Sequence, residues 1–251
     1  MSTLPPRYPT ITSTSLGMAI SIIVGRRRSF LTDATALVAR LKPPLRVIGQ
    51  IPDLGGSAWL VIINHNHRPG FIAWWMPLSI TAMLRREIHW IMTSAWRSVD
   101  RWGMPWLTRL VSRWLRRAAR IYGFTSMPPM PPLEGEAQAR AFAVHQVLKH
   151  IDSTPDAIIG MAPEGRDSPS GELITPPPGV GRFACQLARR RFRLLPAGVF
   201  EVEGNLCLQI GRPQDLPEIE GTAAERDQKM SEVLMRAIAR CIPEHMRGAY
   251  S

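Results

Sequence analysis

The chain has 251 residues, which is enough for one substantial α/β core or for two small domains at most. Apolar residues make up 45% of the sequence and charged residues 20%, a composition that excludes an intrinsically disordered chain. The formal net charge of +11 favours an anionic partner, which can be a nucleic acid, an anionic lipid or a phosphorylated substrate.

The N-terminal part contains an apolar stretch, Leu16 to Val24, that is followed by Arg26, Arg27 and Arg28. This stretch is well short of the ~20 residues that a membrane-spanning helix needs, and its basic residues follow the apolar run, whereas those of a signal peptide precede it. Two interpretations stay open: an interfacial helix with its arginines at anionic headgroups, or a helix that packs on the core. We treat residues 1–42 as an N-terminal helical segment that can associate with a membrane, and residues 43–251 as the folded domain.

Short apolar runs alternate with longer amphipathic runs along the rest of the chain, which is typical of an α/β sheet. We expect strands at residues 45–50, 58–64, 88–93, 157–161, 193–200 and 205–210. We expect helices at residues 69–85, 104–119, 134–151, 179–191 and 223–241. Thr222 and Glu225 have the spacing of a capping box at the start of the last helix. The pattern predicts a single α/β domain with a mixed, mostly parallel sheet flanked by helices.

The expected helix at 104–119 combines an apolar face with a row of arginines. Seven of the eight tryptophans lie between Trp74 and Trp114, interleaved with arginines, a combination that suits a lipid interface or the stacking of nucleic-acid bases. A basic amphipathic helix can lie on an anionic surface, although such a row can also be a solvated face. No nucleic-acid-binding module is recognisable, so we expect no nucleic-acid partner. The row consists of Arg109, Arg113, Arg116 and Arg120.

The first candidate for chemistry is the segment from Trp59 to Phe71, in which an apolar strand runs into Asn64 and His65. Pro69 then stands where a helix can begin. The carboxyl end of a strand before a helix is where α/β proteins place ligands, and a histidine there can accept a proton near neutral pH. The alternative is a histidine that only caps the turn.

The second candidate is the segment from Ile158 to Ser168, where another apolar strand runs into a polar turn. Glu164, Gly165 and Arg166 stand at the tip of this turn. Glycine allows a ligand to approach the backbone closely, and arginine binds phosphate well. Taken alone, however, Pro-Glu-Gly is also ordinary turn chemistry.

Together the two segments resemble the glycerolipid acyltransferases, the family that includes lysophosphatidate acyltransferase. In that family one strand leads to N-H-x-S-x-x-D, and about a hundred residues later another leads to F-P-E-G-T-R-S. Here N-H-N-H-R-P-G stands for the first motif and A-P-E-G-R-D-S for the second. The order of the intervening segments is also similar, and the resemblance covers residues 43 to 215.

The first motif is degenerate. The aspartate that the family places after its histidine falls on Gly70, and His67 takes the place of the usual serine. In the second motif Arg166 stands one place earlier than the family's arginine. Because the family's aspartate orients the imidazole, another acid would have to replace it, and Asp100, Asp167 and Glu164 are the candidates. A protein without such an acid would be slow or inactive.

The resemblance implies a glycerol-3-phosphate acyltransferase-like fold and an O-acyltransferase of phospholipid biosynthesis. A fatty acyl group would pass from an acyl thioester, on coenzyme A or acyl carrier protein, to the hydroxyl of a lysophospholipid or a related lipid acceptor. His65 would be the catalytic base, and no cofactor is implied besides the acyl donor. The enzyme would be peripheral, at the anionic surface of the cytoplasmic face of the membrane. The implied substrate-binding residues are Asn64, His67, Arg68, Glu164, Gly165 and Arg166.

Two other classes of protein stay open. The first is a catalytically impaired member of the same fold that binds a lipid or an acyl carrier, which would explain Gly70. The second is a metal-dependent hydrolase, because His65 and His67 at a strand end also resemble a two-histidine metal site. The remaining histidines stand in no motif, so we expect no metal. The three cysteines lack metal-ligand spacing and fit a reducing, cytoplasmic compartment; they are Cys185, Cys207 and Cys241.

Overall fold

The computed structural model describes residues 5–9, 11–65, 71, 73–94, 105–130, 134–166, 168 and 170–251. The described strands form one eight-stranded sheet in the order β1-β7-β6-β2-β5-β3-β4, with β8 paired to β6. All neighbours pair in parallel except that β7 and β8 run antiparallel to β6. The strands are β1 (Arg46–Ile48), β2 (Trp59–Ile63), β3 (His89–Thr93), β4 (Thr125–Met127), β5 (Ile158–Met161), β6 (Arg193–Val202), β7 (Asn205–Ile210) and β8 (Gln214–Asp215).

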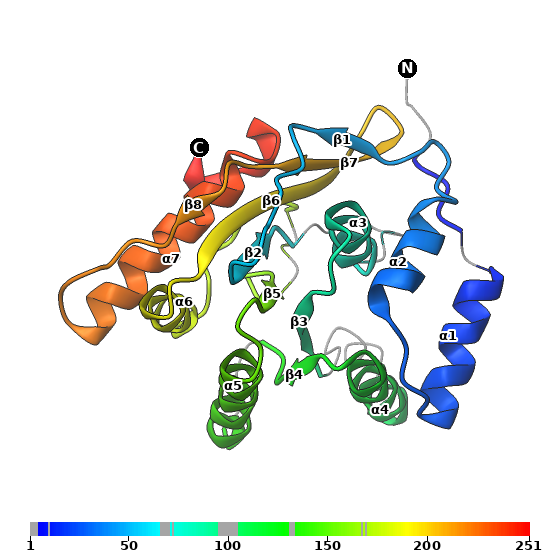
Figure 1. Ribbon diagram of the computed structural model, residues 1–251, viewed down its shortest axis with the longest axis horizontal. Coiled ribbons are helices and arrows are strands. Elements are labelled where there is room, and N and C mark those ends of the chain that lie inside the picture. The colour runs from blue at the N-terminus through cyan, green and yellow to red at the C-terminus, as the bar shows by residue number, and fades with distance from the viewer. Residues whose placement is uncertain are drawn as a thin grey trace.

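Helices cover both faces of this sheet (Figure 1). One core cluster joins the sheet to α5, α6 and α7, and a second joins the opposite face to α2 and α3. Helices α1 and α4 pack against each other beside the second layer, with Ile22 and Ala118 buried between them. The helices are α1 (Ser13–Val24), α2 (Phe30–Val38), α3 (Trp75–Leu84), α4 (Pro105–Tyr122), α5 (Glu136–Asp152), α6 (Val180–Arg189) and α7 (Ala223–Ala239), followed by the short helices η2 (Glu244–Met246) and η3 (Gly248–Tyr250).

The predicted mostly parallel α/β sheet is confirmed. Each of the six expected strands is present, with both ends within two residues of the predicted ones, and Thr222 and Glu225 form the expected capping box. Strands β4 and β8 were not predicted, since they have three and two residues and no apolar alternation. The expected helix at 69–85 is observed as α3 from Trp75. Residues 69, 70 and 72 lie outside the described residues, whereas the described residues 71, 73 and 74 precede the helix, so the predicted start was too early.

The N-terminal helices are tied to the domain by a buried polar network. Arg28 forms a two-pronged ion pair with Asp33, whose side chain is only 2% exposed, and the Nε atom of Arg28 lies 2.7 Å from Oδ2. Tyr122, at the end of α4, donates a hydrogen bond of 2.8 Å to the same oxygen. One of the two interpretations of the N-terminal segment placed Arg28 at lipid headgroups with Arg26 and Arg27. In the structure Arg28 instead joins α1, α2 and α4, because a carboxylate five residues along the chain pairs with it.

Candidate functional site

The two motifs predicted from the sequence meet at one edge of the sheet. Strands β2 and β5 are parallel neighbours, with Ile62 opposite Met161, so the segments that follow them leave the sheet side by side. The carboxyl ends of neighbouring parallel strands are where α/β proteins bind their ligands. The site is therefore built on two adjacent strands that are buried along their whole length.

The side chain of Asn64, directly after strand β2, pairs with the backbone of strand β6. Its side-chain amide donates to the carbonyl oxygen of Val199 on β6 at 3.0 Å and accepts from the N–H of Val199 at 2.8 Å. A carboxamide carries the same donor and acceptor as a peptide group, so this side chain continues the ladder between β2 and β6 by one step. The main chain is then free to leave the sheet at His65, which is half-buried.

The Pro-Glu-Gly segment after β5 is a tight turn. The N–H of Gly165 donates to the carbonyl oxygen of Ala162 at 3.1 Å, and Pro163 stands at the second position, where its fixed φ suits a β-turn. Gly165 leaves the turn with a φ of +64°, a left-handed conformation that glycine adopts without the steric cost of a Cβ. This local geometry sends the side chain of Glu164 inward, where it is 1% exposed.

The carboxylate of Glu164 connects the two motifs directly. Its Oε1 atom accepts a hydrogen bond of 2.7 Å from the backbone N–H of His65, and Oε2 accepts one of 3.0 Å from the N–H of Ile174. Burial of a carboxylate is costly unless amide donors satisfy it, and these two bonds are of the strong, charge-assisted kind. Glu164 thus holds together the segment after β2, the turn after β5 and the segment before α6.

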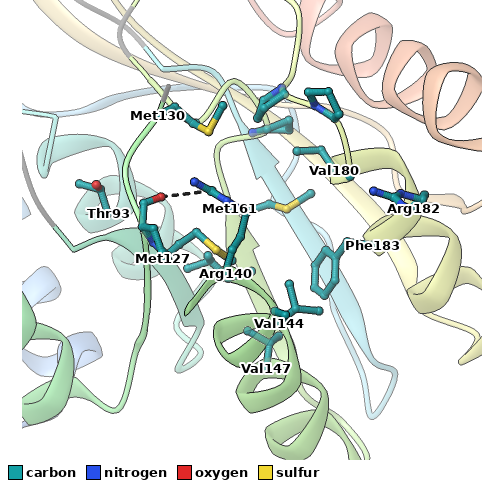
Figure 2. Close-up of a pocket in the computed structure, with 18 of the residues that line it drawn as sticks. Thr93, Met127, Met130, Arg140, Val144, Val147, Met161, Val180, Arg182 and Phe183 are labelled. Carbon is teal, nitrogen blue, oxygen red and sulfur yellow. Dashed lines mark hydrogen bonds between the residues drawn. The ribbon is translucent and has the colours of Figure 1, made fainter. Parts of the chain in front are cut away.

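A cavity of about 690 Å³ lies on the other side of the same turn (Figure 2). Pro163 and Gly165 line it, together with the carboxyl ends of β3 and β4 and the facing sides of α5 and α6. Its volume is within the ~300–1,000 Å³ of typical small-molecule sites. Most of its wall is apolar, including Ile91, Met127, Met130, Val144, Val147, Met161, Val180 and Phe183.

Two charged side chains hold the wall of this cavity in place. The guanidinium of Arg140 on α5 donates to the carbonyl oxygens of Pro128 and Pro129 at 3.2 and 3.3 Å, which fixes the segment that carries Met127 and Met130 (Figure 2). Asp227 on α7 accepts from the backbone N–H groups of Gly179 and Arg182 at 2.7 and 2.9 Å. The Asp227 carboxylate therefore already satisfies amide donors at the N-terminus of α6.

The predicted site residues separate into three groups. Asn64, His65, Glu164 and Gly165 lie together at the sheet edge, and the Arg166 side chain next to them is exposed. His67, Arg68 and Gly70 lie outside the described residues, as do Asp100 and Asp167, two of the acids considered as orienters of His65. Within the described ranges, no group of three or more His, Cys, Asp and Glu side chains is arranged to hold a metal ion. The substrate-binding and catalytic roles stay predictions.

Sequence reasoning missed residues that act through the fold. Val199 and Ile174 take part with their backbone groups, which no side-chain pattern reveals. Asp227 caps a helix that begins 47 residues before it in the chain, so no local spacing points to it. The proline cluster at 176–178 and Gly179 was a usable signal, because prolines followed by glycine mark a fixed entry to a helix.

The chain matches no protein-family model and no curated protein sequence. Among the described residues, none of the helices is long and apolar enough to cross a membrane. The fold is similar to the crystal structure of the 1-acyl-sn-glycerophosphate (LPA) acyltransferase PlsC from Thermotoga maritima, with a TM-score of 0.50 and 14% sequence identity. The similarity covers 92% of this chain and 83% of that chain, so it extends over nearly the whole α/β fold.

Proposed function

We propose that this protein is an O-acyltransferase that moves a fatty acyl group from an acyl thioester to the hydroxyl of a lysophospholipid or a related lipid. The observation that carries the proposal is the position of the Pro-Glu-Gly turn between His65 and an apolar cavity. One side of the turn binds the backbone of a histidine, and the other side forms part of the cavity wall. The fold shared with an LPA acyltransferase supports the same activity.

The cavity would hold the acyl chain of the donor. Its wall of aliphatic, methionine and aromatic side chains suits a hydrocarbon, because burial of each methylene contributes about 0.8 kcal/mol. An acyl chain in the cavity would place its thioester near Gly165, and thus close to the segment that carries His65. Two exposed arginines, Arg182 in the cavity lining and Arg166 next to the lining residue Gly165, would favour the phosphates of coenzyme A or the acidic surface of an acyl carrier protein.

His65 would act as the general base of the transfer. Its imidazole would take the proton from the acceptor hydroxyl while the oxygen attacks the thioester carbonyl carbon. The C–S bond then breaks, the new ester leaves, and the imidazolium returns its proton to the thiolate. The reaction thus yields one ester and one free thiol, with no oxidant or cofactor.

Acyl transfer by the purified protein tests this proposal. Acyl-CoA and acyl carrier protein donors would be supplied with a panel of lysophospholipids, and thiol release and ester formation would both be measured. We expect His65→Ala to abolish transfer with little loss of thermal stability. The paired variant His67→Ala, at an implied substrate-binding position, should keep measurable transfer. Transfer that survives His65→Ala in a folded protein would remove the histidine from the mechanism.

The second candidate function is binding without chemistry. Gly70 stands where the resembled family has an acid that orients its histidine, and this observation favours a protein that keeps the site and has lost the reaction. Such a protein would bind acyl thioesters or lysolipids in the cavity and release no thiol. Binding measured by calorimetry, together with the absence of transfer on every acceptor, would identify this case.

The proposed enzyme would work at an anionic membrane surface. Large apolar side chains of α1 and α4 are exposed on two helices that pack against each other. Exposed arginines stand on and beside the same helices, a combination that favours peripheral binding to anionic lipid. We define the α1–α4 surface by Leu16, Ile20, Ile23, Val24, Trp106, Leu110 and Trp114 with Arg26, Arg27, Arg109, Arg113, Arg116 and Arg120.

A further inference from the structure

The main chain at His65 is fixed from both neighbouring strands. Strand β2 ends opposite Ala197 of β6, and beyond that point Val199 offers one N–H and one C=O toward β2. The amide of Asn64 takes up both groups. On the other side, the N–H of His65 itself is bound by Glu164 from the turn after β5.

Neither of these two side chains offers surface to a ligand. Asn64 is 2% exposed and Glu164 is 1% exposed, and their polar atoms bind backbone groups of the protein itself. An acceptor that contacts the Glu164 carboxylate would compete with the N–H groups of His65 and Ile174, which already donate to it. Gly165 and Arg166 are exposed and stand next in the chain, so they are the better placed to contact a substrate.

Burial of the Glu164 carboxylate lowers the stability of the fold, whereas burial of an apolar side chain at the same position would not. Replacement of a buried charged group by a well-packed apolar residue is often neutral or stabilising, so the presence of Glu164 calls for a role beyond packing. A carboxylate can accept from two differently placed N–H donors at once, whereas an amide can accept at only one of its two ends. The geometry is thus suited to fixing two loops relative to each other.

We propose that Glu164 and Asn64 are positioning residues, which act on the reaction by placing His65 and not by binding the acceptor. This inference rests on the proposed acyl transfer and differs from the substrate-binding role that the sequence predicted for both residues. A small displacement of a reacting group can cost about 100-fold in rate. Loss of either positioning residue should therefore lower kcat and leave the KM for the acceptor nearly unchanged.

Glu164→Gln is the first test, because it keeps the shape of the side chain and removes one acceptor and the charge. Glu172→Gln is the matched control, since Glu172 is an exposed carboxylate in the adjacent segment. We expect kcat to fall by about 100-fold in Glu164→Gln, with KM and the control unchanged. A raised KM with an unchanged kcat would show that Glu164 binds the acceptor, and would overturn the proposal.

A second measurement does not depend on activity. Selective ¹⁵N labelling of histidine gives one backbone amide signal for each of the six histidines, and His65→Ala identifies the one from His65. Because the N–H of His65 is bound to a carboxylate, Glu164→Gln should shift this signal upfield and leave the other five in place. If the His65 signal does not move in folded Glu164→Gln, Glu164 does not position His65. This result would refute the proposal whether or not the protein transfers acyl groups.

Asn64→Asp provides an independent variant. It keeps the size and the acceptor of the side chain but loses the donor to the Val199 carbonyl. We expect the same signature as for Glu164→Gln, a lower kcat at an unchanged KM and a shifted His65 amide signal. If the wild-type protein transfers no acyl group on any acceptor, the proposed function fails, and the amide signals still decide whether the two residues place His65.

Discussion

The indole ring of Trp90 lies over Gly160, its register partner on the neighbouring strand, so closely that a Cβ at position 160 would lie 2.5 Å from the ring. Trp90 is 4% exposed, and its ring N–H donates to the hydroxyl of Thr81 at 3.1 Å. The ring therefore has little room to move away. Strand β5, which contains Gly160, leads directly into the Pro-Glu-Gly turn of the site.

We expect Gly160→Ala to destabilise the protein by about 1–3 kcal/mol, because the added methyl group overpacks the contact with Trp90. Urea unfolding gives the free energy of unfolding of the variant. Trp90→Leu should remove the clash, so the effects of Gly160→Ala and Trp90→Leu should be less than additive when the two are combined. Additive losses would show that the methyl group is accommodated without contact to Trp90.

The Arg28–Asp33–Tyr122 network supports a second prediction about stability. Asp33→Asn leaves the half-buried guanidinium of Arg28 without its carboxylate, which should cost about 2–3 kcal/mol of unfolding free energy. Tyr122→Phe removes only one hydrogen bond and should cost about 1 kcal/mol. Equal losses in the two variants, measured by urea unfolding, would argue against the ion pair as the main link.

The sheet could be predicted from the sequence because its central strands are buried on both faces and read as apolar runs between turns. Trp59–Ile63 and Ile158–Met161 are of this kind, and both were placed within a residue or two. The polar ends of these strands also identified the candidate site, since parallel neighbours bring their carboxyl ends together.

The contacts that organise the site could not be predicted from the sequence. Glu164 was expected to face a substrate, yet its side chain is buried and binds backbone groups at positions 65 and 174. Arg28 was assigned to a basic cluster with Arg26 and Arg27, because the five-residue separation of Arg28 and Asp33 is not a helical spacing that would have indicated an ion pair. Both outcomes depend on the path of the main chain, which side-chain patterns do not specify.

His89 and His150 should make the stability of the protein depend on pH. Their rings stack with centroids 4.1 Å apart, and the Nε2 atom of His89 lies 2.9 Å from the Thr125 hydroxyl. Burial, and then the charge of His150, lower the pKa of His89 to about 4, and burial also lowers the pKa of His150. As pH falls below the unfolded pKa of about 6.5, the unfolded state therefore binds protons first.

The free energy of unfolding should have its full value above a pH of about 6.5 and should fall progressively as pH falls to about 4. His89 should account for a loss on the order of 2–3 kcal/mol. Urea unfolding at several pH values in this range gives the slope of the free energy of unfolding against pH. His89→Gln should flatten the slope, whereas the control variant His245→Gln, at an exposed position, should leave it unchanged. Identical slopes in the wild type and His89→Gln would contradict the assignment.

The length of the cavity should set the preferred acyl chain if the chain binds there. Val144 is half-buried on α5 and lines the cavity, so Val144→Phe adds volume inside it with little disturbance of the core (Figure 2). We expect the ratio of kcat/KM for long over short acyl donors to fall by about 10-fold or more, since the lost burial of two methylenes is about 1.6 kcal/mol. Phe142→Ala, on the exposed side of the same helix, is the control and should leave this ratio unchanged. An unchanged ratio in Val144→Phe would place the acyl chain elsewhere.

Binding of the α1–α4 surface to anionic vesicles should depend on where the arginines stand and not only on their number. Replacement of Arg109, Arg113, Arg116 and Arg120 with Gln removes four charges from this surface. The matched control removes four exposed arginines that stand elsewhere in the structure, namely Arg40, Arg189, Arg212 and Arg240. Each arginine near an anionic surface contributes about 1 kcal/mol, so the first variant should bind far more weakly than the control.

The measurement is co-sedimentation with vesicles of graded anionic lipid content at several salt concentrations. Binding of the wild type should weaken as salt rises, because surface charges are screened within ~8–10 Å at physiological ionic strength. The binding that remains at high salt should fall in Trp106→Ala/Trp114→Ala, since these exposed rings provide the apolar part of the contact. Equal losses of vesicle binding in the two four-arginine variants would show that the attraction depends on the overall charge of the protein and not on the α1–α4 surface. A wild-type protein that stays in the supernatant at low salt on every composition would remove the membrane from the proposed function.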